Sequence, residues 1–108
     1  MTWTVPAKVV RVIDTDTIVL DLDLGWRVYR NREHLRIAGI NAVERGTPEF
    51  EASVAWTRSI LVPGEAVTVV SSAKPSFERT VGSILVHLTD GPRDYADLAV
   101  EAGYAVRV

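Results

Sequence analysis

The sequence feature that most constrains the fold is a strict alternation of side chains along residues 17–24. The apolar members of this alternation are Ile18, Leu20, Leu22 and Leu24. A period of two puts one face of an extended segment into a core and the other into solvent, which is typical of a half-buried antiparallel strand. Gly25 interrupts the pattern, and residues 26–29 are predicted to begin a returning strand.

The other segments follow in an order that indicates a small barrel. Runs of β-branched and other apolar residues predict further strands over residues 7–13, 35–40, 67–71 and 81–88. Gly39 is expected to mark a bend in the third of the predicted strands. A turn is expected at residues 90–92, where Asp-Gly-Pro follows the last strand.

Two helices are expected between and after these strands. Thr47 and Pro48 predict a helix start, with Thr47 as the N-cap. An apolar stripe at helical spacing follows, made of Phe50, Val54, Thr57 and Leu61. A second helix is expected over residues 95–102, between Asp94 as its N-cap and Gly103 at its end. The order β-β-β-α-β-β-α predicts a mainly β chain with two to three helices, folded as a five-stranded OB-fold barrel.

Length and composition limit the function classes. The 108 residues fit a single domain, taken as 1–108. The absence of cysteine excludes disulfides, thiolate metal sites and thiol nucleophiles. His34 and His87 lie on separate predicted strands without a ligand spacing, so a zinc site is not expected. Neither a signal peptide nor a membrane span is recognisable, so a cytoplasmic protein without membrane contact is expected.

The positive charge of the chain is concentrated, although the formal net charge is −2. Five of its ten arginines fall within residues 27–45, against two glutamates. Guanidinium groups bind phosphate in a bidentate manner, and Arg27 and Arg30 are therefore candidates for nucleic-acid contact. Trp26 is the tryptophan best placed to stack on a base. A solvated, salt-bridged hairpin is the alternative interpretation.

Three short stretches carry the residue types that phosphodiester chemistry needs. Residues 13–17 read Ile-Asp-Thr-Asp-Thr, residues 35–44 read Leu-Arg-Ile-Ala-Gly-Ile-Asn-Ala-Val-Glu, and residues 77–79 read Phe-Glu-Arg. Taken alone, the first stretch is equally typical of a solvated turn with Asx-type hydrogen bonds. In this order and spacing, the three stretches resemble the staphylococcal nuclease (thermonuclease) family. Residues 40–44 are similar to bacterial and phage members of it.

The resemblance implies a calcium site. Asp16 matches an aspartate ligand of the family, Asn41 stands at a second ligand position, and Ala42 at a position that offers its backbone carbonyl. Asp14 matches an acid that orients these ligands. Asn41 keeps an oxygen ligand but removes one negative charge compared with the aspartate usual there, so a weak calcium site is expected.

The resemblance also implies catalytic residues. Glu44 matches the glutamate that acts as general base on the attacking water, and Arg36 and Arg79 match the two arginines that hold the scissile phosphate. Phe77 stands where the family has a tyrosine and is expected to contact nucleic acid. The expected activity is calcium-dependent hydrolysis of DNA or RNA, with single strands as the expected substrate. The alternative is a catalytically weakened OB-fold module that binds single-stranded nucleic acid or a protein partner.

Overall fold

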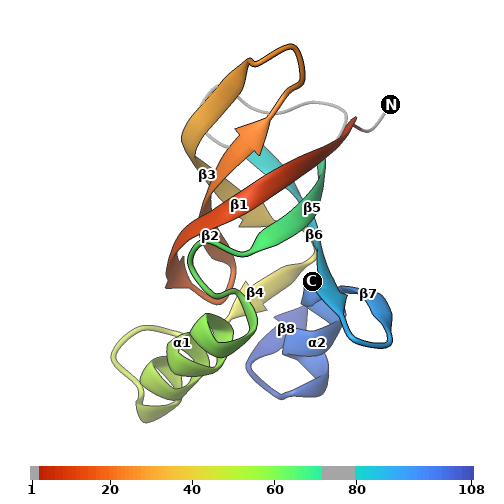
Figure 1. The fold of residues 1–108 in the computed structure, drawn as a ribbon. Coiled ribbons are helices and arrows are strands. Elements are labelled where there is room, and N and C mark those ends of the chain that lie inside the picture. Colours follow the sequence, from red (N-terminus) through yellow and green to blue (C-terminus); the bar gives the residue numbers. More distant parts are fainter. Residues whose placement is uncertain (1–2, 72–79) are drawn as a thin grey trace.

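The structure is a computed structural model that describes residues 3–71 and 80–108 (Figure 1). Within these residues the chain forms eight strands and two helices. Their bounds in chain order are β1 (Trp3–Asp14), β2 (Thr17–Asp23), β3 (Tyr29–Ile37), β4 (Ile40–Ala42), α1 (Pro48–Ile60), β5 (Ala66–Ser71), β6 (Thr80–Leu88), β7 (Gly91–Asp94), α2 (Tyr95–Glu101) and β8 (Ala105–Arg107). Neither helix of this described part is long and apolar enough to cross a membrane.

Five of the described strands close into a barrel. β3, β2, β1, β5 and β6 are antiparallel neighbours in that order, and a parallel pairing of β3 with β6 joins the two edges. A Cβ atom at Gly82 of β6 would lie 2.5 Å from the Val70 carbonyl oxygen of β5, so the close approach of these strands needs glycine there. The mainly β, five-stranded, OB-fold-like barrel with two helices confirms the fold class predicted from the sequence.

The hairpin and the helices occupy opposite ends of the barrel. The β2–β3 hairpin projects from one end, at the top of Figure 1, and α1, α2, β4 and β8 lie at the other. The barrel interior is filled by apolar side chains of its strands, all less than a tenth exposed: Val9, Val12, Ile18, Leu20, Leu35, Ile37, Val69 and Ile84.

The alternation in residues 17–24 holds with two exceptions. Ile18, Leu20 and Leu22 are buried as predicted. Val19 is also buried, at 1% exposure, because it lies on the outer face between Arg11 of β1 and His34 of β3, whose long side chains flank it. Leu24 is 41% exposed, since β2 ends before it and the hairpin leaves the barrel there.

The predicted strands around the hairpin need correction. The returning strand begins at Tyr29 rather than at Trp26, because Trp26 and Arg27 form the tight turn with φ of 56° and 60°. The Val28 N–H donates to the Gly25 carbonyl across this turn at 2.9 Å. β3 then runs without interruption from Tyr29, and it ends at Ile37 rather than at residue 40. Gly39, with φ of 80°, turns the chain into the short strand β4, which pairs with β8.

The helices lie where the sequence places them. Thr47 is the N-cap residue of α1, but its hydroxyl donates to the Glu44 carbonyl at 2.8 Å instead of capping the helix. Asp94 does cap α2, because its carboxylate accepts from the Ala96 N–H at 2.8 Å. The turn predicted at 90–92 is shorter, since Gly91 already belongs to β7, which pairs with β6.

Candidate functional site

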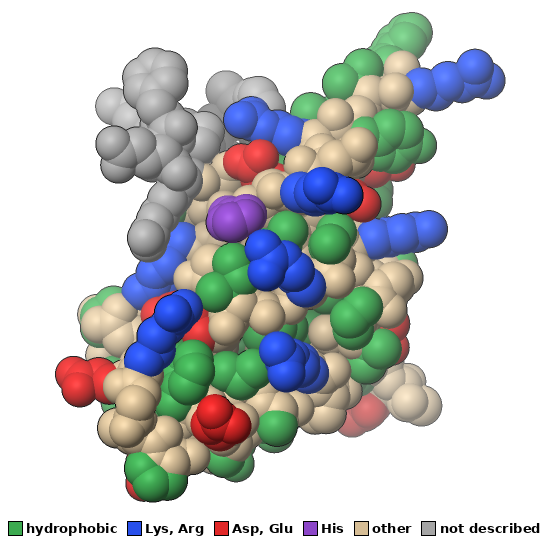
Figure 2. All heavy atoms as spheres, turned by 90° about the vertical axis from the view of Figure 1, so that its left-hand side faces the viewer, with side chains coloured by type: hydrophobic (Ala, Val, Ile, Leu, Met, Phe, Trp, Pro, Cys, Tyr) green, Lys and Arg blue, Asp and Glu red, His purple; other side chains and the backbone are tan. Residues whose placement is uncertain are grey.

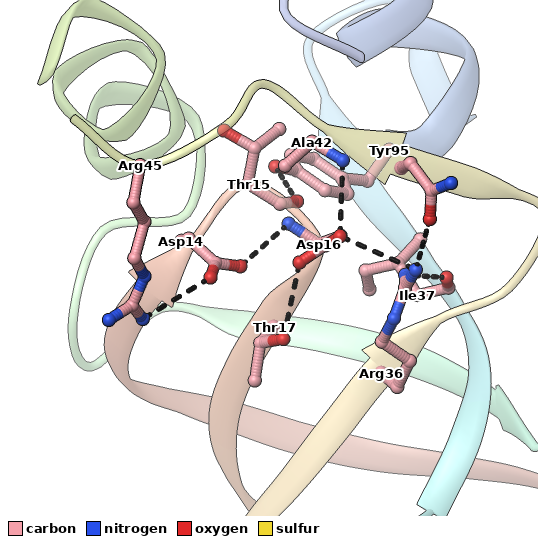
Figure 3. Close-up of polar contacts among 10 residues, drawn as sticks. Asp14, Thr15, Asp16, Thr17, Arg36, Ile37, Ala42, Arg45 and Tyr95 are labelled. Atoms are coloured by element: carbon pink, nitrogen blue, oxygen red, sulfur yellow. Dashed lines mark hydrogen bonds and ion pairs between the residues drawn. The ribbon is translucent and has the colours of Figure 1, made fainter. Parts of the chain in front are cut away.

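Residues from three separate parts of the chain meet at the helix end of the barrel (Figure 3). Asp14 ends β1 and Asp16 lies in the β1–β2 turn. Arg36 lies near the end of β3, and Asn41 and Ala42 lie on β4. We call these five residues the Asp16–Arg36 cluster. The Asp16 carbonyl accepts from the Ile37 N–H at 2.9 Å, and its carboxylate accepts from the Ala42 N–H at 3.1 Å. These two bonds fix the turn against both β3 and β4.

The guanidinium of Arg36 lies at the centre of the cluster. Its Nη2 donates to the Asn41 Oδ1 atom at 2.7 Å and lies 3.4 Å from the Asp16 Oδ2 atom. Its Nη1 donates to the Ile37 carbonyl at 2.7 Å. Arg36 and Asp16 have side-chain exposures of 22% and 16%, so their ion pair is half-buried and less screened than a surface pair. In this arrangement Arg36 holds two of the predicted calcium ligands.

The pKa values of Asp14 and Asp16 are shifted in opposite directions. Burial, together with the hydrogen bond and charge of Asp16, raises the pKa of Asp14 from 3.8 to about 6. Burial also acts to raise the pKa of Asp16, but hydrogen bonds from Asp14 and the Ala42 N–H and the charge of Arg36 outweigh it and lower that pKa. Asp16 is therefore the ionised member of the pair, and Asp14 is the member that holds a proton in mildly acidic solution.

A buried polar network supports the turn from behind. The Tyr95 hydroxyl of α2 donates to the Thr15 carbonyl at 2.6 Å. The Thr57 hydroxyl of α1 lies 3.1 Å from the Thr15 hydroxyl and 3.0 Å from the Tyr95 hydroxyl. All three side chains are 0% exposed, and burial raises the pKa of the Tyr95 phenol, which therefore stays protonated. Thr15 thus has a structural role that links the turn to both helices.

The residues that support the site, Tyr95, Thr57 and Arg45, are not predicted as such from the sequence. Tyr95 and Thr57 carry no local motif, although Thr57 belongs to the predicted apolar stripe of the first helix. Arg45 was counted only as part of the arginine run. Its Nη2 lies 3.5 Å from the Asp14 Oδ2 atom, and its guanidinium lies 5.7 Å from the centre of the Phe50 ring. Burial has the largest effect on the pKa of Asp14 and raises it, whereas a hydrogen bond from Arg45 acts in the opposite direction.

Glu44 lies apart from the cluster. It follows β4 and is exposed, and its side chain has no hydrogen bond or ion pair with a described residue. A cavity of about 320 Å³ is lined by Asn41, Ala42 and Glu44 on one side and by Ala105 and Val106 of β8 on the other. Glu44 therefore shares this cavity with Asn41 and Ala42 of the cluster, whereas Asp16 and Arg36 do not line it.

Four predicted site residues remain, namely Arg27, Arg30, Phe77 and Arg79. Arg79 and Phe77 are outside the described residues. Arg27 lies in the exposed tip of the β2–β3 hairpin, and Arg30 of β3 forms a 3.0 Å ion pair with Glu33. The structure does not bring these two arginines to the cluster, because the hairpin projects from the opposite end of the barrel (Figure 1).

The oxygen donors of the cluster fit a hard cation. Asp16 supplies a carboxylate, Asn41 an amide oxygen and Ala42 a backbone carbonyl, which are ligand types that calcium accepts, with water completing the shell. Among residues 3–71 and 80–108, no three His, Cys, Asp or Glu side chains are grouped closely enough to hold a metal. A cation in this place would have a single carboxylate and would compete with Arg36 for Asp16 and Asn41.

The chain matches no protein-family model and no curated protein sequence.

Proposed function

We propose that the chain is a calcium-dependent nuclease, similar to staphylococcal nuclease, that hydrolyses phosphodiester bonds of DNA or RNA at the Asp16–Arg36 cluster. The single observation that carries this proposal is the convergence of Asp16, Arg36 and Asn41. Asp16 comes from the first of the three stretches and Arg36 and Asn41 from the second, and the Arg36 Nη2 atom lies 2.7 Å from the Asn41 Oδ1 atom and 3.4 Å from the Asp16 Oδ2 atom. The resemblance of these stretches to the staphylococcal nuclease family implies a shared site.

The chemistry assigns one task to each side chain. Arg36 binds two oxygens of the scissile phosphate and stabilises the negative charge that develops on them. Asp16, Asn41 and the Ala42 carbonyl would hold calcium, which polarises a phosphoryl oxygen when it is bound. Glu44 accepts the proton of the attacking water. Arg79 is proposed as the second arginine on the phosphate.

Removal of the Arg36 charge tests this proposal. We expect Arg36→Ala to lower cleavage of single-stranded DNA by about 100-fold or more, since it removes a donor aimed at the transition state. Arg36→Lys keeps the positive charge but loses the two-pronged guanidinium group. Its cleavage rate should lie between those of wild type and Arg36→Ala. The matched control is Arg93→Ala, which removes an exposed arginine that pairs with Glu101 far from the cluster. Equal cleavage by Arg36→Ala and Arg93→Ala would contradict the assignment.

A second candidate function has its own supporting observation. The Arg36 guanidinium is already bonded to Asn41, Asp16 and the Ile37 carbonyl, and Glu44 lies outside this network. A cluster whose side chains already satisfy one another also suits a module that binds single-stranded nucleic acid or a protein partner without cutting. Such a module binds an oligonucleotide with the same affinity in calcium and in chelator and leaves it intact, whereas the nuclease cuts it only in calcium.

A further inference from the structure

The outer face of β1, β2 and β3 forms a continuous surface from the cluster to the hairpin. Residues directly opposite in antiparallel strands share a face. Near the cluster Thr17 lies opposite both Asp14 and Arg36, and the next row places Val19 between Arg11 and His34. Farther along, Lys8 lies opposite Asp21, and Asp23 opposite Tyr29. The strands therefore connect the candidate phosphate site to the base of the hairpin.

This face carries exposed cations along its length. Lys8 and Arg11 are exposed, and Arg36 is half-buried at its end. Figure 2 views the molecule from the side on which β3 lies in Figure 1, and blue Lys and Arg side chains are spread over this side from the hairpin to the helix end. A spread of cations at intervals suits the evenly spaced charges of a phosphate backbone better than it suits one compact anion.

A groove opens on the same face at the base of the hairpin. It has a volume of about 510 Å³ and is lined by Tyr29, Lys8, Asn31 and the two carboxylates Asp21 and Asp23. Tyr29 is 59% exposed, so its ring is open to a ligand. Asp21 accepts from the Arg32 N–H at 2.8 Å and Asp23 from the Gly25 N–H at 2.9 Å. Their negative charges repel a phosphate inside the groove, whereas an aromatic ring and amide group suit a base.

We propose that this groove is a distal base site for single-stranded nucleic acid, in which Tyr29 stacks on a base and Lys8 contacts the adjoining phosphate. The proposal rests on the proposed function for the direction of the strand, which runs from Arg36 along the outer face. Tyr29 and Arg36 are separated along β3 by roughly 20 Å at the usual rise of an extended strand. At the stacked spacing of about 3.4 Å per nucleotide this is about six nucleotides, and fewer in an extended strand.

The test measures binding of a labelled single strand of about 16 nucleotides, a length at the upper end of the site size of such folds. The Glu44→Gln variant serves as the background, so that cleavage does not consume the probe. We expect Tyr29→Ala to weaken binding about tenfold, as loss of one stacked base does. Tyr29→Phe, the matched control that keeps the ring, should bind normally. Lys8→Ala should lower the slope of log affinity against log salt by about one, whereas Arg93→Ala should leave it unchanged.

The cleavage readout separates this inference from the proposed function. If the chain is a nuclease, Tyr29→Ala should reduce cleavage of the long strand but leave cleavage of a dinucleotide unchanged, because a dinucleotide does not reach the groove. Weaker binding by Tyr29→Ala in a protein that never cuts would support the base site and contradict the nuclease. Cleavage of the long strand that is insensitive to Tyr29→Ala and Lys8→Ala would overturn the base site and leave the nuclease standing. Failure of the protein to bind any single strand would overturn the base site as well.

Discussion

The Asn41 amide oxygen accepts its 2.7 Å hydrogen bond from the same Arg36 nitrogen that lies 3.4 Å from the Asp16 carboxylate. The Arg36 guanidinium therefore binds both side chains, Asp16 and Asn41, that would act as calcium ligands. An amide attracts both the Arg36 guanidinium and a calcium ion less strongly than a carboxylate does, because it carries no charge. In the proposed calcium site, the identity of residue 41 would therefore control both the affinity for calcium and the freedom of Arg36 to bind phosphate.

Asn41→Asp should strengthen calcium binding. The substitution keeps the size of the side chain and restores a second carboxylate, and calcium affinity in proteins rises with the number of charged ligands. We expect the calcium concentration for half-maximal binding to fall by about tenfold or more. Titration calorimetry measures this directly and does not depend on cleavage. Asn41→Ala, which removes the oxygen, should bind calcium more weakly than the wild type, and equal affinity of all three proteins would contradict the ligand assignment.

Asp14→Asn should change the pH dependence of stability. The folded protein keeps a proton on Asp14 up to about pH 6, whereas the unfolded chain releases it near 3.8. The folded state therefore binds more protons in this interval, so the free energy of unfolding contributed by Asp14 falls as pH rises from about 4 to about 6. The lowered pKa of Asp16 changes the free energy of unfolding only at pH values below this interval.

Asp14→Asn removes the carboxyl group whose loss of a proton lowers the free energy of unfolding. We expect the variant to be more stable than wild type at pH 7 by about 1–2 kcal/mol, less than the full value of the shift because the carboxyl is partly solvated. Urea unfolding in chelator at pH 4 and pH 7 measures the difference. Parallel pH profiles of the two proteins would show that Asp14 does not titrate in this way.

Tyr95→Phe should destabilise the protein through the β1–β2 turn. The substitution leaves the Thr15 carbonyl, deep in the structure, without its 2.6 Å donor. An unsatisfied buried acceptor costs about 1–3 kcal/mol, which thermal unfolding resolves. Because Thr57 belongs to the same network, Tyr95→Phe and Thr57→Val together should cost less than their sum. Tyr104→Phe is the matched control, since this half-buried ring packs on Trp56 at 5.5 Å and lies outside the network.

The hairpin tip should gain stability from residues that accept its turn geometry. Trp26 and Arg27 both have positive φ, which is unfavourable for residues other than glycine and asparagine. Trp26→Asn combined with Arg27→Gly should therefore raise the free energy of unfolding by about 1 kcal/mol. Thermal unfolding is the measurement, and Arg30→Ala controls for the loss of a hairpin arginine. A loss of stability in the double variant would mean that the turn differs from the one described.

The barrel could be predicted from the sequence because each strand has its own local apolar pattern. The alternation around Ile18, Leu20 and Leu22 and the apolar run of β6 mark strand faces without knowledge of their partners. The hairpin tip was predicted wrongly because nothing in the Trp26-Arg27 pair signals positive φ, and only the pairing of β2 with β3 forces that turn. The break between Ile37 and Ile40 follows from the pairing of β4 with β8, which depends on the distant C-terminal end of the chain.

The site was predictable in membership but not in arrangement. That Asp16, Arg36 and Asn41 share a site was expected from the resemblance of their stretches to the staphylococcal nuclease family. That Arg36 bridges the other two could not be predicted, since it depends on how β3 and β4 lie after the turn at Gly39. Tyr95 and Thr57 were missed for the same reason, because their partner Thr15 is far away in the chain and meets them only in the closed barrel.

Cleavage of heat-denatured DNA across a calcium series, with wild type and Glu44→Gln side by side, tests the central claim most directly. Glu44 is exposed, so its conversion to the isosteric amide should leave the fold intact, which circular dichroism verifies. We predict calcium-dependent cleavage by wild type and a loss of about 100-fold or more in Glu44→Gln, the upper range of general-base catalysis. Absence of cleavage by folded wild-type protein at every calcium concentration, or equal cleavage by both proteins, would contradict the account.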